Sequence, residues 1–324
     1  MSSTSFKPAW WLPGPHLQTL WGALIRRNQH KGLQITRERI ELSDGDFIDL
    51  DWTGQKGQPI VVILHGLEGS AQSSYAHGLL KVFSQHKNWR AVVMHFRGCS
   101  GEQNRLPRFY HSGDTADLNT VINLLREREL NMPISAVGVS MGGNVLLKWL
   151  GETGRQNPLV AAVAVSTPFE LRQSVLRLRN GFSRVYDRHL LNRLRKKINE
   201  KFSMQVSPIA LPTRKSLRTV NDFDELVTAP LHGFQNANDY YEKSSSRQFI
   251  KFIKIPTLLL QAKDDPFMFP DVIPKKDELS PSVILEATDQ GGHVGFVMGK
   301  FPWRPCYWLE QRIPEFLELY LRSS

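Results

Sequence analysis

The chain has 324 residues, of which 41% are hydrophobic and 22% charged, so it can bury a large core and lacks the composition of a disordered protein. Its two cysteines, Cys99 and Cys306, lie far apart without a CxxC partner, which excludes a disulfide framework or a cysteine zinc site and suits a reducing compartment. The net charge of +10 comes mainly from the segment between Leu171 and Arg218, where thirteen Lys and Arg stand against two acidic residues.

The N-terminal stretch is apolar but discontinuous. Prolines, polar residues and Gly14 interrupt residues 1–22, so we expect neither a secretory signal nor a transmembrane span there. Apolar runs elsewhere in the sequence are too short to cross a bilayer. We therefore expect a soluble cytoplasmic protein.

The first elements in chain order are two strands around a turn. The turn dipeptide Asp44-Gly45 separates segments 34–42 and 46–52, and this pattern predicts an antiparallel hairpin. Short apolar runs then recur along the chain, each typical of a strand that is buried on both faces. These runs are 59–66, 89–98, 134–140, 159–166, 256–265 and, more weakly, 282–288.

Helical segments alternate with these runs. Apolar residues recur at helical spacing in 75–86, 114–129, 141–152 and 308–321. Buried strands that alternate with helices predict an α/β fold with a mostly parallel central sheet and helices on both faces. Residues 167–250 break the alternation, because they contain helical, basic stretches but no apolar strand run. We predict that this segment is a helical cap insertion over the carboxyl ends of the strands, and that 1–166 and 251–324 form the core. Its apolar residues are expected to face the sheet and form a wall of the site, while the Arg and Lys between them face solvent. These apolar residues are Phe169, Leu171, Val175, Leu176 and Phe182.

The most specific motif is a serine between glycines. Gly138-Val139-Ser140-Met141-Gly142 follows an apolar strand and precedes a helical segment, which is the context that a nucleophilic serine elbow requires. On such a sharp turn the chain passes so close on either side that Gly138 and Gly142 leave no room for side chains. The sequence therefore predicts Ser140 as a nucleophile.

A serine hydroxyl needs a base, and enzymes with this elbow carry serine, acid and histidine in that chain order. His293 is the one histidine beyond His232, and it lies in a glycine-rich loop after the last predicted strand, so we predict that it is the base. The acid that orients it is one of two neighbours at the end of the 256–265 run. Asp265 is favoured over Asp264, because its spacing to the following proline is closer to the usual pattern.

The oxyanion formed in such a reaction needs backbone donors. We predict the N–H of Met141, directly after the nucleophile, and the N–H of Leu67, in the loop after the first apolar run. Gly66 gives that loop room to turn its amides inward. His65 is expected to be a structural hydrogen-bonding residue.

Other features indicate structural roles. Arg97 is expected to brace loops, and Trp10, Trp11 and Trp21 are expected to pack on the body of the protein. GxGxxG and P-loop sequences are absent, and the acids and histidines lack metal-ligand spacing, so the sequence predicts no cofactor and no metal. The basic segment has no nucleic-acid-binding motif. We interpret it as a solvated helical face and as a candidate for peripheral contact with anionic membranes.

These motifs together resemble the AB hydrolase 4 family of the α/β-hydrolase superfamily, in particular its bacterial YheT-type esterases. The matching segments are PHLQT (15–19), DGDFIDL (44–50), HGLEGS (65–70), YAHGL (75–79), VMHFRGCSGE (93–102), YHSGDT (110–115), GVSMGGN (138–144), GFSRVY (181–186), AKDDPFM (262–268) and GGHVGF (291–296). The resemblance implies an α/β-hydrolase fold with a triad at Ser140, Asp265 and His293. One departure is Met141, where the family often has leucine, and this swap conserves volume.

Eukaryotic members of that family act on medium-chain esters and lipids, and some transfer acyl groups to alcohols. The expected function is therefore hydrolysis of short- to medium-chain acyl or lipid esters through an acyl-serine intermediate. An acyltransferase, in which an alcohol replaces water, would use the same residues and stays open as an alternative. A binding protein on the same scaffold is disfavoured by the intact Ser, Asp and His set. The sequence carries no signal for an oligomeric state.

Overall fold

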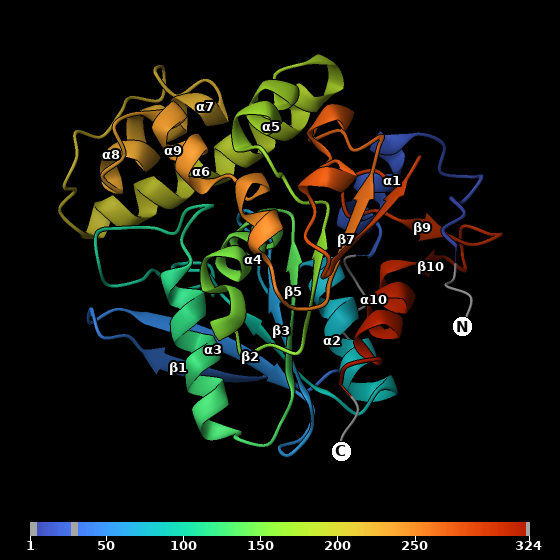
Figure 1. Ribbon diagram of the computed structural model, residues 1–324. Helices are drawn as coiled ribbons and strands as arrows, with labels where there is room; N and C mark the ends of the chain where they lie inside the picture. The colour runs from blue at the N-terminus through green and yellow to red at the C-terminus, as the bar shows by residue number, and fades with distance from the viewer. Residues whose placement is uncertain (1–4, 27–31, 322–324) are drawn as a thin grey trace.

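The computed structural model describes residues 5–26 and 32–321, and at its centre lies an eight-stranded sheet (Figure 1). The strand order is β1-β2-β4-β3-β5-β6-β7-β8. The strands are β1 (Thr36–Glu41), β2 (Phe47–Thr53), β3 (Ile60–Leu64), β4 (Arg90–Met94), β5 (Ile134–Val139), β6 (Ala161–Val165), β7 (Thr257–Ala262) and β8 (Val283–Thr288). β1 and β2 form the predicted hairpin, β2 pairs antiparallel with β4, and the other neighbours are parallel. The predicted fold class is confirmed.

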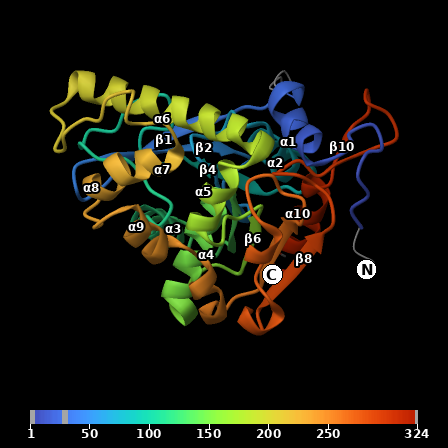
Figure 2. The ribbon, with the colours of Figure 1, turned by 90° about the horizontal axis from the view of Figure 1, so that it is seen from above.

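Helices cover both faces of the sheet (Figures 1 and 2). They are α2 (Ser74–His86), α3 (Ala116–Arg128), α4 (Met141–Thr153) and α10 (Leu309–Leu317). In β3, Val62 lies in an apolar cluster with residues of α3 and α4, while its neighbour Val61 lies in a second cluster with residues of α2 and α10. Successive side chains of a strand point to opposite faces, so a continuous apolar run requires this cover on both sides.

The strands end earlier than predicted where the chain turns. β3 ends at Leu64 and β7 at Ala262, so His65 and Asp265 lie in the loops that follow these strands. The last helix is also shorter than the predicted 308–321, because it spans Leu309–Leu317 and contains Pro314. Residues placed just beyond a strand's carboxyl end are free to adopt irregular conformations, as a site requires.

The segment between β6 and β7 is helical. Figure 1 shows its helices above the sheet, on the side toward which β5 and β7 point. They are α5 (Leu171–Leu178), α6 (Arg184–Met204), α7 (Val220–Phe223), a π-helix (Asp224–Thr228), α8 (Ala229–Leu231), α9 (Ala237–Ser244) and the 3₁₀ helix η5 (Arg247–Phe252). All of these helices except η5 contribute to an apolar cluster that also contains Phe109 of the core. The predicted boundary at residue 250 divides η5, whose Ile250 packs in the same cluster as α4.

A short helix near the N-terminus, α1 (Pro15–Leu24), lies against the C-terminal part of the chain. Its Gln18 is 1% exposed and both donates to the Val297 carbonyl and accepts from the Val297 amide. The expectation for the tryptophans is confirmed for Trp11, whose ring meets that of Trp21 at 4.7 Å. It is wrong for Trp10, which donates to the Lys300 carbonyl but leaves 77% of its surface exposed. Within residues 5–26 and 32–321, the helices are too short or too polar to cross a membrane.

Candidate active site

Ser140 stands on the turn between β5 and α4. Its backbone is left-handed (φ 54°, ψ −121°), a costly conformation for a residue with a side chain and one that clusters at functional sites. A β-carbon on Gly138 would lie 2.5 Å from the Gly142 oxygen, and one on Gly142 would lie 2.4 Å from the Leu64 oxygen. A side chain at either position would therefore push the turn apart, which explains the glycine spacing of the motif.

The structure brings His293 and Asp265 to this serine from two other loops. The His293 Nε2 atom lies 3.0 Å from Ser140 Oγ, and its Nδ1 atom lies 2.9 Å from Asp265 Oδ2. Asp265 is 2% exposed and also accepts from the Phe267 amide at 2.8 Å. The Phe267 ring stacks on the imidazole at a centroid distance of 3.9 Å and 12° between the planes. The imidazole is thus held by a carboxylate on one edge and by an aromatic face.

Asp264 contacts the backbone of the histidine loop and not the imidazole. Its Oδ1 atom accepts from the amide of Gly292 at 2.9 Å, next to His293 in the chain. Burial raises the pKa of this carboxyl, while the Gly292 amide acts in the opposite direction. Asp264 therefore holds the loop that carries the histidine, whereas Asp265 meets the imidazole itself.

The loop after β3 lies beside the serine, since a β-carbon on Gly66 would lie 3.2 Å from Ser140 Cβ. Neighbouring amides are occupied, because the N–H of Gly66 donates to Tyr75 Oη and the N–H of Glu68 donates to Tyr110 Oη, both at 2.8 Å. Leu67 lies between them and lines the same cavity as Ser140 and Met141. Met141 is the first residue of α4, where the backbone N–H has no partner within the helix.

His65 has the structural role expected of it. The Phe96 amide donates to His65 Nε2 at 3.2 Å, which leaves Nδ1 to carry the proton and donate to the Gly66 carbonyl at 2.8 Å. Burial lowers the pKa of His65 to about 3, so the ring is neutral at pH 7. In a trans peptide the C=O and N–H point in opposite directions, so holding the Gly66 carbonyl also orients the Leu67 N–H.

Two residues that the sequence did not single out also support the site. Thr19 of α1 accepts the His293 amide at 2.9 Å through Oγ1, and Tyr75 of α2 holds the Gly66 amide. A β-carbon on Gly292 would lie 2.5 Å from the Pro15 oxygen, so α1 and the histidine loop touch. Thr19 belongs to the segment PHLQT, whose family match was the one available signal for this role.

A cavity of about 660 Å³ opens in front of Ser140, a typical size for a small-molecule site. Helices α5 to α9 supply much of its apolar wall: Leu171, Val175, Leu178, Leu194, Val220, Phe223 and Val227. On the other side it is lined by Leu20 and Leu24 of α1. Among the described residues, no three His, Cys, Asp or Glu side chains are grouped to hold a metal ion.

The expected apolar wall of the insertion is only partly correct. Leu171 and Val175 line the cavity, as predicted, but Phe169 packs in the main core. Leu176 is 40% exposed and Phe182 50% exposed, so the prediction that they face the cavity is wrong. Leu176 follows Val175 directly, and adjacent helix residues point about 100° apart, so both cannot face the same cavity.

The expectation that the basic residues face solvent holds in α6 for Arg184, Arg188, Arg193 and Lys196, but it is wrong for Lys197 and Lys201. Lys197 is 7% exposed and Lys201 is fully buried, each against polar groups of the core, and Arg195 donates to the Leu217 carbonyl. Of the three cations 195–197, Lys196 has the exposed side chain, 77% accessible. Part of the basic segment thus serves to attach the insertion to the core.

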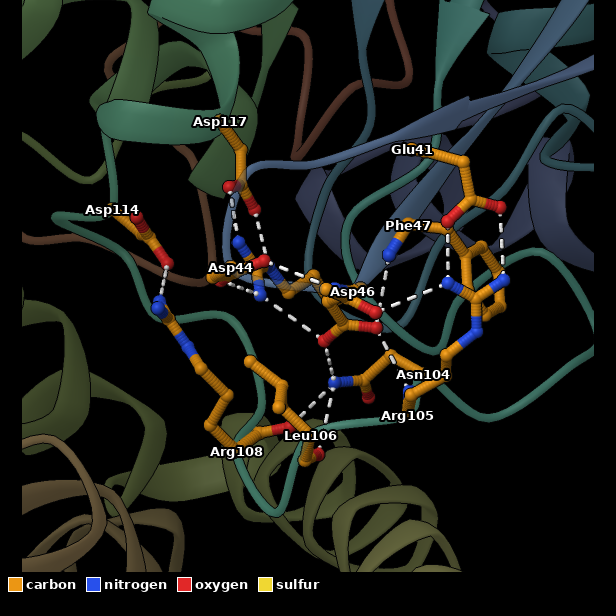
Figure 3. Close-up of polar contacts among 12 residues, drawn as sticks. Glu41, Asp44, Asp46, Phe47, Asn104, Arg105, Leu106, Arg108, Asp114 and Asp117 are labelled. Carbon is orange, nitrogen blue, oxygen red and sulfur yellow. Dashed lines mark hydrogen bonds and ion pairs between the residues drawn. The ribbon is translucent and has the colours of Figure 1, made fainter.

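Arg97 braces loops, as predicted. Figure 3 shows the carboxylates of Asp44, Asp46 and Asp117 near one another, beside the loop that carries Asn104. Arg97 is 4% exposed and donates to Asp117 at 2.7 and 2.8 Å, to Asp44 at 2.7 Å and to Asp46 at 3.0 Å. Asn104 in turn donates to Asp46 at 2.7 Å. This network lies outside the residues that line the cavity.

Comparison with known proteins agrees with this architecture. Residues 59–299 match the α/β hydrolase fold family. The chain is 44% identical over its whole length to the protein named "Putative esterase YheT" of Escherichia coli, and it covers 96% of that protein. Over 88% of its length it is 31% identical to the phospholipase ABHD3 of Mus musculus, of which it covers 72%. The esterase Pf2001 of Pyrococcus furiosus has a similar structure, with a TM-score of 0.60 at 17% identity over 90% of this chain and 92% of that one.

The chain therefore belongs to the α/β hydrolase fold family. The expected class of enzyme, a carboxylic ester hydrolase, is confirmed by these relatives.

Proposed function

We propose that the chain hydrolyses carboxylic esters through an acyl-serine intermediate, with Ser140 as nucleophile, His293 as general base and Asp265 as the acid that orients it. The observation that supports this proposal is the chain of contacts from Ser140 Oγ through both nitrogens of His293 to Asp265. A serine hydroxyl alone is a weak nucleophile, and this arrangement supplies a base within hydrogen-bond reach.

In the proposed reaction, His293 takes the Ser140 proton as the oxygen attacks the ester carbonyl. The negative charge that develops on the carbonyl oxygen is stabilised by the amides of Leu67 and Met141. His293 then gives the proton to the departing alcohol, and water repeats the sequence to release the acid. The carboxylate of Asp265 stabilises the imidazolium that forms in each half and keeps the ring in the required tautomer.

The substrates that we propose are short- to medium-chain acyl esters or lipid esters. The cavity wall in the insertion is mainly aliphatic, and it lies next to Ser140, where an acyl chain would have to extend. Burying such a chain contributes about 0.8 kcal/mol per methylene group. The names of the relatives, an esterase and a phospholipase, agree with this class.

We also propose that contact with membranes takes place at the rim of the cavity. Leu24 and Val185 line the cavity but are 57% and 53% exposed, and beside them Phe182 packs against His16 of α1, with ring centroids 4.5 Å apart. Arg184 and Arg188 are exposed on the same end of α6. Exposed apolar residues next to cations are suited to an anionic bilayer.

The test uses a fluorophosphonate probe, which reacts with activated serines, together with esters of graded acyl length. We expect one labelled site, lost in Ser140→Ala, with ester turnover lost in parallel. Ser174→Ala is the matched control, because Ser174 also lines the cavity but donates to the Glu170 carbonyl instead of meeting a histidine. Labelling that persists in Ser140→Ala would contradict the proposal. Adding an alcohol would show by product analysis whether acyl transfer competes with hydrolysis.

A further inference from the structure

Three cations of helix α6 contact loops of the core, and two of them, Lys197 and Lys201, are buried. Arg193, Lys197 and Lys201 are spaced four residues apart and therefore share one face of the helix. Arg193 donates to the Glu68 carbonyl, and Lys197 Nζ lies 2.6 Å from Glu68 Oε1 and 2.9 Å from Cys99 Sγ. Lys201 donates to the Asn104 carbonyl and side-chain oxygen, both at 2.8 Å. Two of these three cations thus meet a single residue of the loop after β3.

Glu68 is held at each of its polar groups. Its amide donates to Tyr110 Oη, and the same hydroxyl donates back to its Oε1 atom at 2.8 Å. Its carbonyl accepts from Arg193 and its carboxylate pairs with Lys197. Glu68 also has a positive φ of 54°, which is costly for a residue with a side chain. The backbone on the C-terminal side of Leu67 is therefore set by contacts to α6 and to Tyr110.

A buried ion pair is a poor source of stability, because removing two charges from water costs about as much as their attraction returns. Glu68 and Lys197 are each 7% exposed. Placing such a pair directly after Leu67, the proposed oxyanion donor that lines the cavity with Ser140, suggests a gain in geometry instead. Donors of an oxyanion hole must lie 2.7–3.1 Å from the developing charge, so small displacements matter.

We propose that Lys197 is a positioning residue for the oxyanion hole. Through the carboxylate of Glu68 it holds the Leu67 amide in place, so the hole is complete only when α6 is docked on the core. The inference rests on the proposed function. The insertion would then have two roles: it forms a wall of the cavity, and it helps to stabilise the transition state.

The experiment compares Lys197→Met with Lys201→Met. Both variants remove a buried cation from the same face of α6, but Lys201 contacts the Asn104 loop and not the loop after β3. For Lys197→Met we expect kcat to fall about 10- to 100-fold and KM to change less than about 3-fold. This loss of kcat is smaller than the one caused by removing an oxyanion-hole donor altogether, because the Leu67 amide is displaced and not lost. Affinity for a trifluoromethyl ketone, whose serine adduct carries an oxyanion, should fall in parallel with kcat/KM. Lys201→Met should lower the melting temperature and leave kcat and this affinity near the wild-type values.

Glu68→Gln provides a second route, because it keeps the volume and the bond to Tyr110 and removes the charge. We expect kcat to fall in Glu68→Gln as well, by a smaller factor than in Lys197→Met. The double variant Glu68→Gln/Lys197→Met should lose no more kcat than Lys197→Met alone, because both changes break the same contact. Equal effects of Lys197→Met and Lys201→Met on kcat, or an unchanged kcat in Glu68→Gln, would overturn the inference. A wild-type protein that neither reacts with the probe at Ser140 nor turns over esters would overturn the proposed function, and the inference with it.

Discussion

At the scale of single residues, two adjacent aspartates contact different partners. Asp265 meets the imidazole of His293, and Asp264 accepts the amide of Gly292 in the loop that carries this histidine. Adjacent residues in a turn point in different directions, so one supplies the charge beside the ring and the other fixes the backbone. Both carboxylates contact the His293 loop or its ring, but they should differ strongly in their effect on turnover.

Asp265→Asn should reduce kcat by about 10⁴-fold, because the amide favours the wrong tautomer of His293. Asp264→Asn should reduce it by less than about 10-fold, since the side-chain oxygen of asparagine can still accept from Gly292. Steady-state kinetics with one soluble ester would measure both, and circular dichroism would check that both variants fold. If Asp264→Asn proved the more damaging change, the orienting acid would have to be reassigned.

Burial lowers the pKa of three histidines, of which His65 is fully buried while His111 and His232 are half-buried at the wall of the cavity. The pKa is about 3 for His65, His111 and His232, with neighbouring charges adding to the effect of burial. In the unfolded chain each would titrate near 6.5. Between pH 6.5 and 3 the unfolded state therefore binds more protons than the folded state, and these residues make the protein less stable as the pH falls through this window.

His232→Gln should make the free energy of unfolding less dependent on pH. Each histidine contributes up to one proton to the difference between the states, or about 1.4 kcal/mol per pH unit. Urea unfolding of the variant and the wild type at pH 7 and pH 4.5 would measure this difference. If the free energy of unfolding changed by the same amount between the two pH values in both proteins, His232 would take up no proton on unfolding.

At the scale of elements, α5 separates two surfaces. Val175 is 7% exposed and lines the cavity, while the next residue, Leu176, is 40% exposed and lies outside it. The two side chains are similar in chemistry and differ in direction. The helix thus offers a matched pair of positions for asking whether the insertion contacts the acyl chain.

Val175→Ala should shift the preferred substrates toward longer or bulkier acyl groups, because it widens the cavity by two methyl groups. The change in relative kcat/KM should be a few-fold, as about 0.8 kcal/mol per methylene implies. Leu176→Ala should leave the chain-length profile as it is in the wild type. A profile of kcat/KM against acyl length would separate these outcomes, and identical profiles for both variants would place the acyl chain elsewhere.

At the scale of the whole molecule, the cavity opens between α1 and the start of α6, which come from distant parts of the chain. Ile25 is 61% exposed at the end of α1, and Phe182 is 50% exposed before α6. Neither lines the cavity. They provide a way to test membrane contact without altering the catalytic residues.

Ile25→Asp and Phe182→Asp should each weaken binding to anionic vesicles several-fold, because a charge must then enter the interface. Turnover of a soluble ester should stay near the wild-type value. Leu130→Asp is the control, since Leu130 is 81% exposed but lies between α3 and β5, at the amino ends of the parallel strands. Vesicle sedimentation at two salt concentrations would test this, and added salt should weaken wild-type binding. Equal binding by all three variants would exclude the rim as the contact surface.

Much of this protein could be predicted from the sequence because the relevant constraints are local. The runs of apolar residues predicted strands β3 to β8, since a strand buried on both faces has to be continuously apolar, and the turn dipeptide Asp44-Gly45 predicted the hairpin of β1 and β2. Gly138 reflects a contact within the turn, with the Gly142 oxygen, whereas Gly142 makes room for the carbonyl of Leu64, which is distant in the chain. His293 could be selected because chain order and its glycine-rich loop limited the choice. The distances that join Ser140, His293 and Asp265 agree with the predicted set, while their roles stay a proposal.

The incorrect predictions concern the directions in which side chains point, which the sequence does not specify. Lys197 and Lys201 look like surface residues, because a lysine is usually solvated, and they are buried because Glu68 and Asn104 supply partners from more than 90 residues away. Leu176 and Phe182 look like core residues, but the place of Leu176 on α5 turns it outward, and Phe182 is half-exposed in the turn between α5 and α6. Thr19 gained its contact with His293 only when α1 docked on a loop 274 residues away. Such pairings depend on how distant segments pack, so they could be known only from the folded structure.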